Sequence, residues 1–88
     1  IGNTAGNDTQ GLGSIAIGLS AGQTTQSTYC VAMGSSAGSV SQAQKAIAIG
    51  FDAGETTQGA FGIAIGNGAG NSGQGSSCVA IGTNSATT

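Results

Sequence analysis

The chain has 88 residues, of which 18 are Gly and none is Pro, His or Trp. Only Asp8, Lys45, Asp52 and Glu55 are charged, and the net charge is −2. A single cation cannot form a phosphate-binding surface, so nucleic acid is not an expected partner. No apolar run approaches the ~20 residues of a membrane-spanning helix, so we expect no membrane insertion. Because the chain begins with Ile1, we expect an excerpt of a longer polypeptide.

The sequence is a tandem array of one sixteen-residue unit, without insertions or deletions. The units cover 1–16, 17–32, 33–48, 49–64 and 65–80, and a partial unit covers 81–88. Each complete unit has Gly at position two, Ala-Gly at positions five and six, Gln at position ten and Ala at its end. This period is too short for helical repeats or propeller blades, whose periods run from about 33 residues upward.

Apolar residues alternate with a period of two where successive units join, which predicts a β-strand at each junction. The predicted strands contain 14–18, 30–34, 46–50, 62–66 and 78–82. The Ala-Gly pair and the polar stretch then supply the turns and leave room for a second short strand. The array therefore predicts an all-β fold, a parallel β-solenoid of five and a half coils in a single domain.

The two faces of the predicted strands carry different residues. Odd-numbered positions hold large aliphatic side chains, and we interpret this face as the core of the coil. The other face is small throughout, which is unusual for a solvated surface. We therefore predict that this small face packs against another copy of the chain. Its oligomer-face candidates are the Ala residues that close the units: Ala16, Ala32, Ala48, Ala64 and Ala80.

Energy favours self-association of such a thin coil. About two buried aliphatic side chains per coil contribute roughly 1.5–3 kcal/mol each, which is far less than the cost of ordering the backbone. We therefore predict a homo-oligomer, with a trimer favoured and a filament as the alternative.

Four bulky apolar residues alternate between the two ends of successive strands: Leu19, Tyr29, Phe51 and Phe61. We interpret them as packing at the edge of the core, with a sticky surface patch as the alternative.

A column of Gln is the sharpest polar feature of the array: Gln10, Gln26, Gln42, Gln58 and Gln74. Stacked amides hydrogen-bond from rung to rung, so we predict a structural ladder rather than a ligand-binding stripe. The preceding hydroxyl column of Thr9, Thr25, Ser41 and Thr57 is typical of ice-binding solenoids, but Gly73 interrupts it.

The sequence offers no catalytic or metal-binding constellation. It lacks His, the usual general base and the commonest metal ligand. Cys30 and Cys78 lie three coils apart, about 14 Å at the spacing of stacked strands, which excludes a disulfide between them. We therefore predict that the chain is not an enzyme and needs no cofactor.

The five strands, such as Ser14-Ile15-Ala16-Ile17-Gly18 and Ala46-Ile47-Ala48-Ile49-Gly50, resemble the S-[VI]-A-[IV]-G strand in head domains of trimeric autotransporter adhesins. Similar repeats occur in fibre proteins of phages and large viruses. The resemblance implies a left-handed parallel β-roll, a homotrimer and an extracellular location on a cell or virion surface. It also implies attachment to a host-surface or matrix receptor. The usual repeat of that family is nearer fourteen residues, so the turns differ here.

Overall fold

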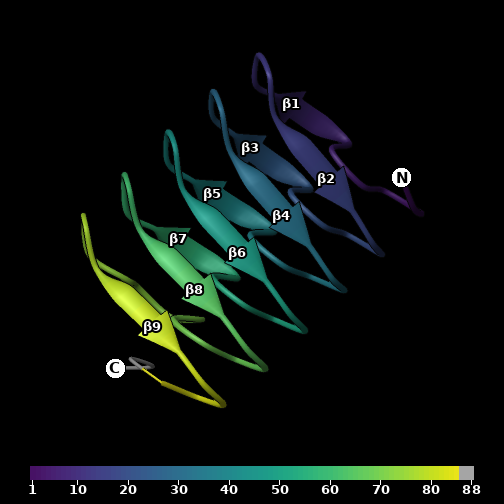
Figure 1. Cartoon of the computed structure of the whole chain (residues 1–88). Coiled ribbons are helices and arrows are strands. Elements are labelled where there is room, and N and C mark those ends of the chain that lie inside the picture. The colour runs from purple at the N-terminus through teal and green to yellow at the C-terminus, as the bar shows by residue number, and fades with distance from the viewer. Residues whose placement is uncertain (86–88) are drawn as a thin grey trace.

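The computed structural model describes residues 1–85, which form two parallel sheets and contain no helix (Figure 1). The four-stranded sheet contains β1 (Asp8–Gln10), β3 (Thr24–Gln26), β5 (Val40–Gln42) and β7 (Thr56–Gln58). The five-stranded sheet contains β2 (Ile15–Ile17), β4 (Val31–Met33), β6 (Ile47–Ile49), β8 (Ile63–Ile65) and β9 (Val79–Ile81). The predicted all-β parallel solenoid and the second short strand in each coil are confirmed.

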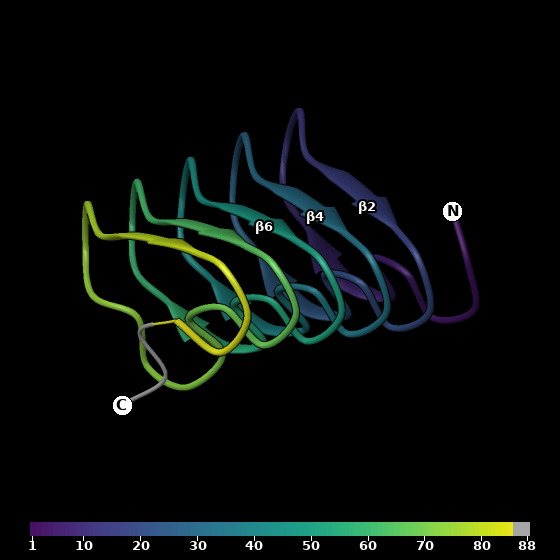
Figure 2. The ribbon, with the colours of Figure 1, turned by 60° about the horizontal axis from the view of Figure 1, so that its bottom comes forward.

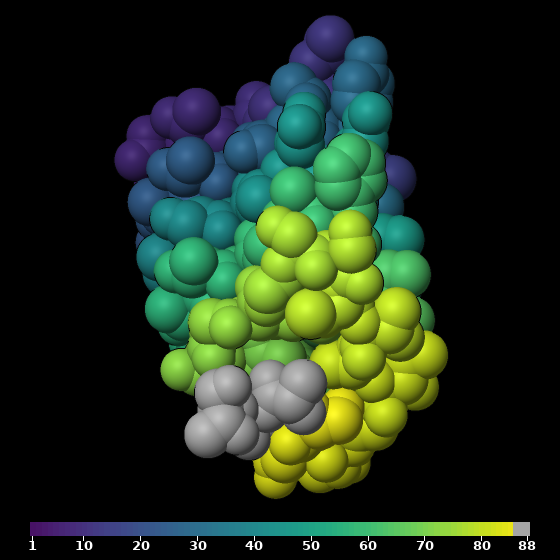
Figure 3. Space-filling view, turned by 90° about the vertical axis from the view of Figure 1, so that its left-hand side faces the viewer, coloured from purple at the N-terminus to yellow at the C-terminus, as the bar shows by residue number. Residues whose placement is uncertain are grey.

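Equivalent residues of successive units lie beside one another throughout the array. In the five-stranded sheet Ile15 pairs with Val31, Val31 with Ile47, Ile47 with Ile63 and Ile63 with Val79. In the four-stranded sheet Gln26 pairs with Gln42. The sixteen-residue period is therefore the length of one coil, and Figure 3 shows the coils stacked in chain order with the C-terminal ones nearest.

Each coil turns at residues in the left-handed backbone conformation. In the second unit these include Ser20, Thr25 and Tyr29, with φ of 59°, 56° and 59°. The equivalent residues of the neighbouring units also have positive φ. Such corners are unfavourable for residues other than Gly, so the stacking of neighbouring coils must stabilise them. They let strands of only three residues close a narrow coil.

The interior of the coil is filled by Ala and Gln rather than by Ile and Val. Ala32, Ala48 and Ala64 on the five-stranded sheet are fully buried, as are Gln26 and Gln42 on the four-stranded sheet. The prediction that the large aliphatic residues form the core is therefore wrong. The aliphatic face of each strand points outward, and the small face points into the coil.

The oligomer-face candidates are wrong for the same reason. Ala16, Ala32, Ala48, Ala64 and Ala80 point into their own coil and expose between 0% and 6% of their surface. The cause is the width of the coil. A Cβ added to Gly54 would lie 2.9 Å from Gln58 Cδ and 3.2 Å from Ala48 Cβ, so the space between the sheets is already full.

Gly at the second position of each unit allows the coils to approach closely. Gly34 has φ of 119°, and a Cβ there would lie 2.8 Å from the carbonyl of Gly50 in the next coil. Neither the backbone conformation nor the available space admits another residue. The five complete units share this requirement, which explains why their second position is Gly.

Candidate interaction surfaces

The Gln column forms a hydrogen-bonded ladder inside the coil. Gln26 Nε2 donates to Gln42 Oε1 at 3.2 Å, Gln42 to Gln58 at 3.1 Å and Gln58 to Gln74 at 3.2 Å. The same amides cross the coil to the opposite sheet, as where Gln42 Nε2 donates to the Val31 carbonyl at 2.8 Å. The ladder therefore ties successive coils together and also ties the two sheets together. Its burial leaves these amides no surface to offer a ligand.

The first member of the column behaves differently. Gln10 is exposed, and its Nε2 donates to the Ser14 carbonyl at 3.3 Å. It does not reach Gln26 Oε1, which is buried and has no hydrogen-bond partner among residues 1–85. The ladder thus begins at Gln26, and its first acceptor oxygen is unsatisfied.

The outer side of the five-stranded sheet is a continuous aliphatic face. We define this aliphatic face by two columns, Ile15, Val31, Ile47, Ile63 and Val79, and Ile17, Met33, Ile49, Ile65 and Ile81. Ile15 exposes 46% of its surface and Ile81 exposes 64%. Monomeric proteins rarely expose contiguous apolar patches larger than a few hundred Å². A face of this kind is typical of an interaction surface.

Bulky residues flank this face at both edges. Leu19, Tyr29, Phe51 and Phe61 are between 50% and 56% exposed, so the prediction that they pack at the edge of the core is wrong. Because the aliphatic side of each strand points outward, these bulky residues extend the outer aliphatic face instead. Lys45 Nζ lies 5.4 Å from the centre of the Phe61 ring, a cation–π distance.

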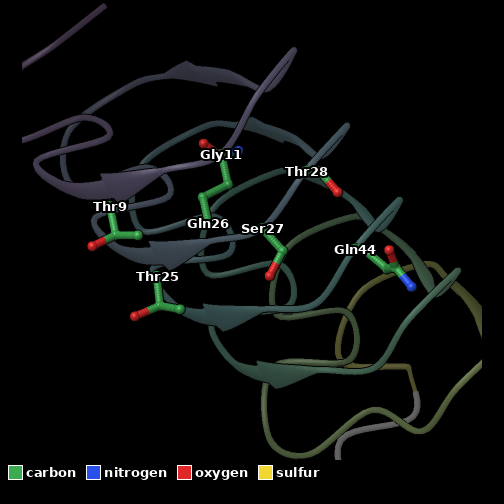
Figure 4. Close-up of a pocket in the computed structure, with 7 residues that line it drawn as sticks. All are labelled: Thr9, Gly11, Thr25, Gln26, Ser27, Thr28 and Gln44. Carbon is green, nitrogen blue, oxygen red and sulfur yellow. The ribbon is translucent and has the colours of Figure 1, made fainter.

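A groove runs along the stack beside the four-stranded sheet. Figure 2 shows a narrow loop rising from each coil before its strand in the five-stranded sheet. Two hollows of about 440 and 490 Å³ share Thr25 and Ser27 and follow these loops along the stack. Figure 4 shows Thr9 and Thr25 on neighbouring strands at the wall of the first hollow. The hydroxyl column is exposed along this wall.

The two thiols lie in different environments. Cys30 is buried, and its Sγ donates to the Ala43 carbonyl at 2.8 Å, whereas Cys78 is exposed. Burial raises the pKa of the Cys30 thiol, although nearby backbone groups act in the opposite direction. Neither cysteine forms a disulfide within residues 1–85.

The described residues contain few charged groups. Burial, and to a lesser degree the Asp52 carboxylate, raises the pKa of Glu55. Across residues 1–85 no three His, Cys, Asp or Glu side chains come together to hold a metal ion. The same residues contain no helix that is both long and apolar enough to cross a membrane.

Comparison with known proteins finds no matching family, no similar curated protein and no similar solved structure.

Proposed function

We propose that this chain is a structural segment of a fibre, a rigid β-solenoid whose copies associate through the aliphatic face. In this role each chain is one protomer of a thicker rod. The rod carries attachment at a cell or virion surface, and its contribution is mechanical rather than catalytic. The observation on which the proposal chiefly rests is the uninterrupted aliphatic face on the outside of a coil whose interior is already full.

The composition of the two sides of the strand supports self-association. Residues that fill the core of an ordinary domain, such as Ile47 and Ile49, lie on the outer face, while Ala48 between them is fully buried. Burial of each outer side chain contributes roughly 1.5–3 kcal/mol if it becomes complete. A neighbouring copy with the same flat face and the same strand spacing would provide that burial. Homotrimers and filaments both satisfy this requirement.

The construction of the coil supports a mechanical role. Backbone hydrogen bonds join every coil to the next, and the Gln ladder adds a second set inside. A stack of identical coils can be extended without changing any contact. Such a rod transmits force and resists proteolysis because its backbone polar groups are paired.

Mass in solution tests the assembly directly. The 8.2 kDa chain should give a stable multiple of that mass by light scattering, with three copies favoured, or extended filaments. Ile49→Asp on the aliphatic face should reduce the mass to that of one chain. Val40→Asp is the matched control, since Val40 is 42% exposed but lies on the other sheet. A wild-type chain that stays folded and monomeric at high concentration would overturn the proposal.

Attachment at an extracellular surface is supported by the likeness of the strands to those of trimeric autotransporter adhesins. Beads coated with the array should bind extracellular matrix or host-cell surfaces more than beads coated with a shuffled sequence do. Equal binding by both would remove the adhesive role and leave a rod without a binding function of its own.

Ice binding is a second candidate, favoured by the exposed hydroxyl column. Thr9, Thr25, Ser41 and Thr57 lie at equivalent places of neighbouring strands and are all exposed. The small face that could have formed a flat ice-binding plane lies inside the coil. The hydroxyl column is therefore the remaining candidate for an ice-binding surface. Thermal hysteresis that disappears in Thr25→Lys would establish the alternative, and its absence in the wild type would exclude it.

A further inference from the structure

The groove beside the four-stranded sheet is lined by equivalent residues of successive coils. One wall is the exposed hydroxyl column, and the other is formed by the loops, to which Thr28 and Gln44 belong (Figure 4). Small residues at equivalent places line the groove between these walls: Ser27, Ala43 and Gly59. The groove therefore crosses the strands and offers a similar surface at each rise of about 4.8 Å.

The lining of the groove is polar but uncharged. Thr25, Thr57 and Gln44 expose hydroxyl or amide groups along it, and the lining contributed by residues 1–85 contains no charged side chain. Lys45 follows Gln44 in the chain, but its Nζ lies over the Phe61 ring, 5.4 Å from the ring centre. Desolvating a charged ligand here would cost free energy that no opposite charge offsets. The groove therefore suits a neutral ligand.

The backbone at the bottom of the groove is already used by the stacking of the coils. Ser27 N donates to the Gln42 carbonyl at 3.0 Å, and Ala43 N donates to the Gln58 carbonyl at 3.0 Å. An extended peptide that adds to a sheet binds through unpaired backbone groups at the sheet edge. A ligand that lies across the strands must instead be held by side-chain hydroxyl and amide groups.

We propose that this groove binds a neutral linear polysaccharide, with the sugar chain lying along the axis of the solenoid. The inference names a ligand class for the attachment role and rests on that part of the proposed function. Sugar hydroxyls donate and accept hydrogen bonds, as Thr and Ser hydroxyls do. One unit of an extended sugar chain is similar in length to the rise of one coil, so successive units meet equivalent residues. The two hollows, of about 440 and 490 Å³, have the size of ordinary ligand sites.

Two neighbouring hydroxyls on β7 provide a matched test. Thr57 lines the groove, whereas Thr56 is also exposed but lines neither hollow. The probes are soluble neutral hexasaccharides of glucose, of mannose and of N-acetylglucosamine, titrated into the folded chain by calorimetry. At least one should bind. Thr57→Ala should weaken its binding roughly three- to tenfold, and Thr56→Ala should change it less than about twofold.

A larger side chain in the groove should block the site. Ala60→Leu narrows the second hollow, and the backbone accepts Leu because Leu12 occupies the equivalent place of the first unit. We expect the affinity for the hexasaccharide to fall at least about tenfold. Circular dichroism checks that each variant remains folded. Ile49→Asp on the aliphatic face should leave the affinity per chain unchanged, even where it abolishes assembly.

Several outcomes would overturn the proposal. They are failure of all three neutral probes to bind, equal losses for Thr56→Ala and Thr57→Ala, and loss of binding in Ile49→Asp, which would place the site on the aliphatic face. Tighter binding of a sulfated hexasaccharide or of an extended peptide would identify another class of ligand. Attachment of array-coated beads without binding of any probe would remove the polysaccharide and leave the attachment role intact.

Discussion

Two sets of side chains on the same strands have opposite relations to solvent. On β6, Ala48 points inward and is fully buried, while its neighbours Ile47 and Ile49 point outward and are partly exposed. In most domains the larger apolar residues would occupy the interior. This contrast shows that the width of the coil, rather than the hydrophobicity of the side chain, determines which face of the strand points inward. The larger residues are then available to a second copy.

Among the inward-pointing side chains, those of the Gln ladder should tolerate substitution least. Gln42→Ala removes donors to the Val31 and Ala46 carbonyls and to Gln58 Oε1, and it leaves a cavity. We expect a loss of about 3–5 kcal/mol in the free energy of unfolding. Urea denaturation at one fixed chain concentration measures it. Gln10→Ala is the matched control and should change stability by under about 0.5 kcal/mol, since Gln10 is exposed.

Substitution by Leu should have different effects on the inward and outward sides of β6. Ala48→Leu adds atoms to a filled interior and should destabilise the coil by about 1–3 kcal/mol or more. Ile49→Leu keeps the volume of an outward residue and should cost less than about 1 kcal/mol. Thermal unfolding of both variants at equal concentration compares them. Similar small losses for the two substitutions would contradict the assignment of the faces.

The thiols give a chemical comparison of inside and outside. Cys78 is exposed and should react with a thiol reagent in the folded protein, whereas Cys30 should react on the order of 100-fold more slowly. Burial raises the pKa of the Cys30 thiol, which lowers its thiolate fraction further. Mass spectrometry of partly labelled chains measures both rates. In urea the two rates should become similar.

The smallest effect concerns Glu55. Its pKa is raised in the folded state by burial and by the Asp52 carboxylate. The folded chain therefore holds this proton more tightly than the unfolded chain does. The resulting stabilisation is present below the unfolded-state pKa and is lost as the pH rises through the folded-state pKa. Glu55→Gln should remove this pH dependence and change the free energy of unfolding at neutral pH by less than about 0.5 kcal/mol. Thermal unfolding of both chains, from below the unfolded-state pKa of Glu55 to neutral pH, measures the effect.

The coil length, the strand positions and the stacking of Ile15 over Val31 were predictable because a strict period places equivalent residues in columns. The assignment of the faces was not. Alternation shows that Ile15 and Ala16 point in opposite directions, but it does not show which direction is inward. The Gln column contained a usable signal, since a buried amide ladder and two columns of large aliphatic residues do not fit together in one narrow coil.

The surfaces were less predictable than the fold. The groove beside Thr25 depends on the loops that rise from each coil, and their height follows from corner conformations that residue types such as Tyr29 do not reveal. The bulky residue at each edge was visible in the sequence, but whether it pointed inward followed from the face assignment. Once the aliphatic face was placed outside, the same alternation became a property of the surface.

Proximity between Ala methyl groups and Gln side-chain amides tests the central claim most directly. In a selectively labelled chain, nuclear Overhauser effects should connect the Gln58 amide protons to the Ala48 methyl group, because both side chains fill the interior beside Gly54. Ile47 is not a suitable reporter, because Gln58 Nε2 donates to its backbone carbonyl at 2.6 Å, but the methyl groups of Ile49 should show none to that amide. Strong effects from the Ile49 methyl groups, with none from Ala48, would place the aliphatic residues inside the coil and contradict the account.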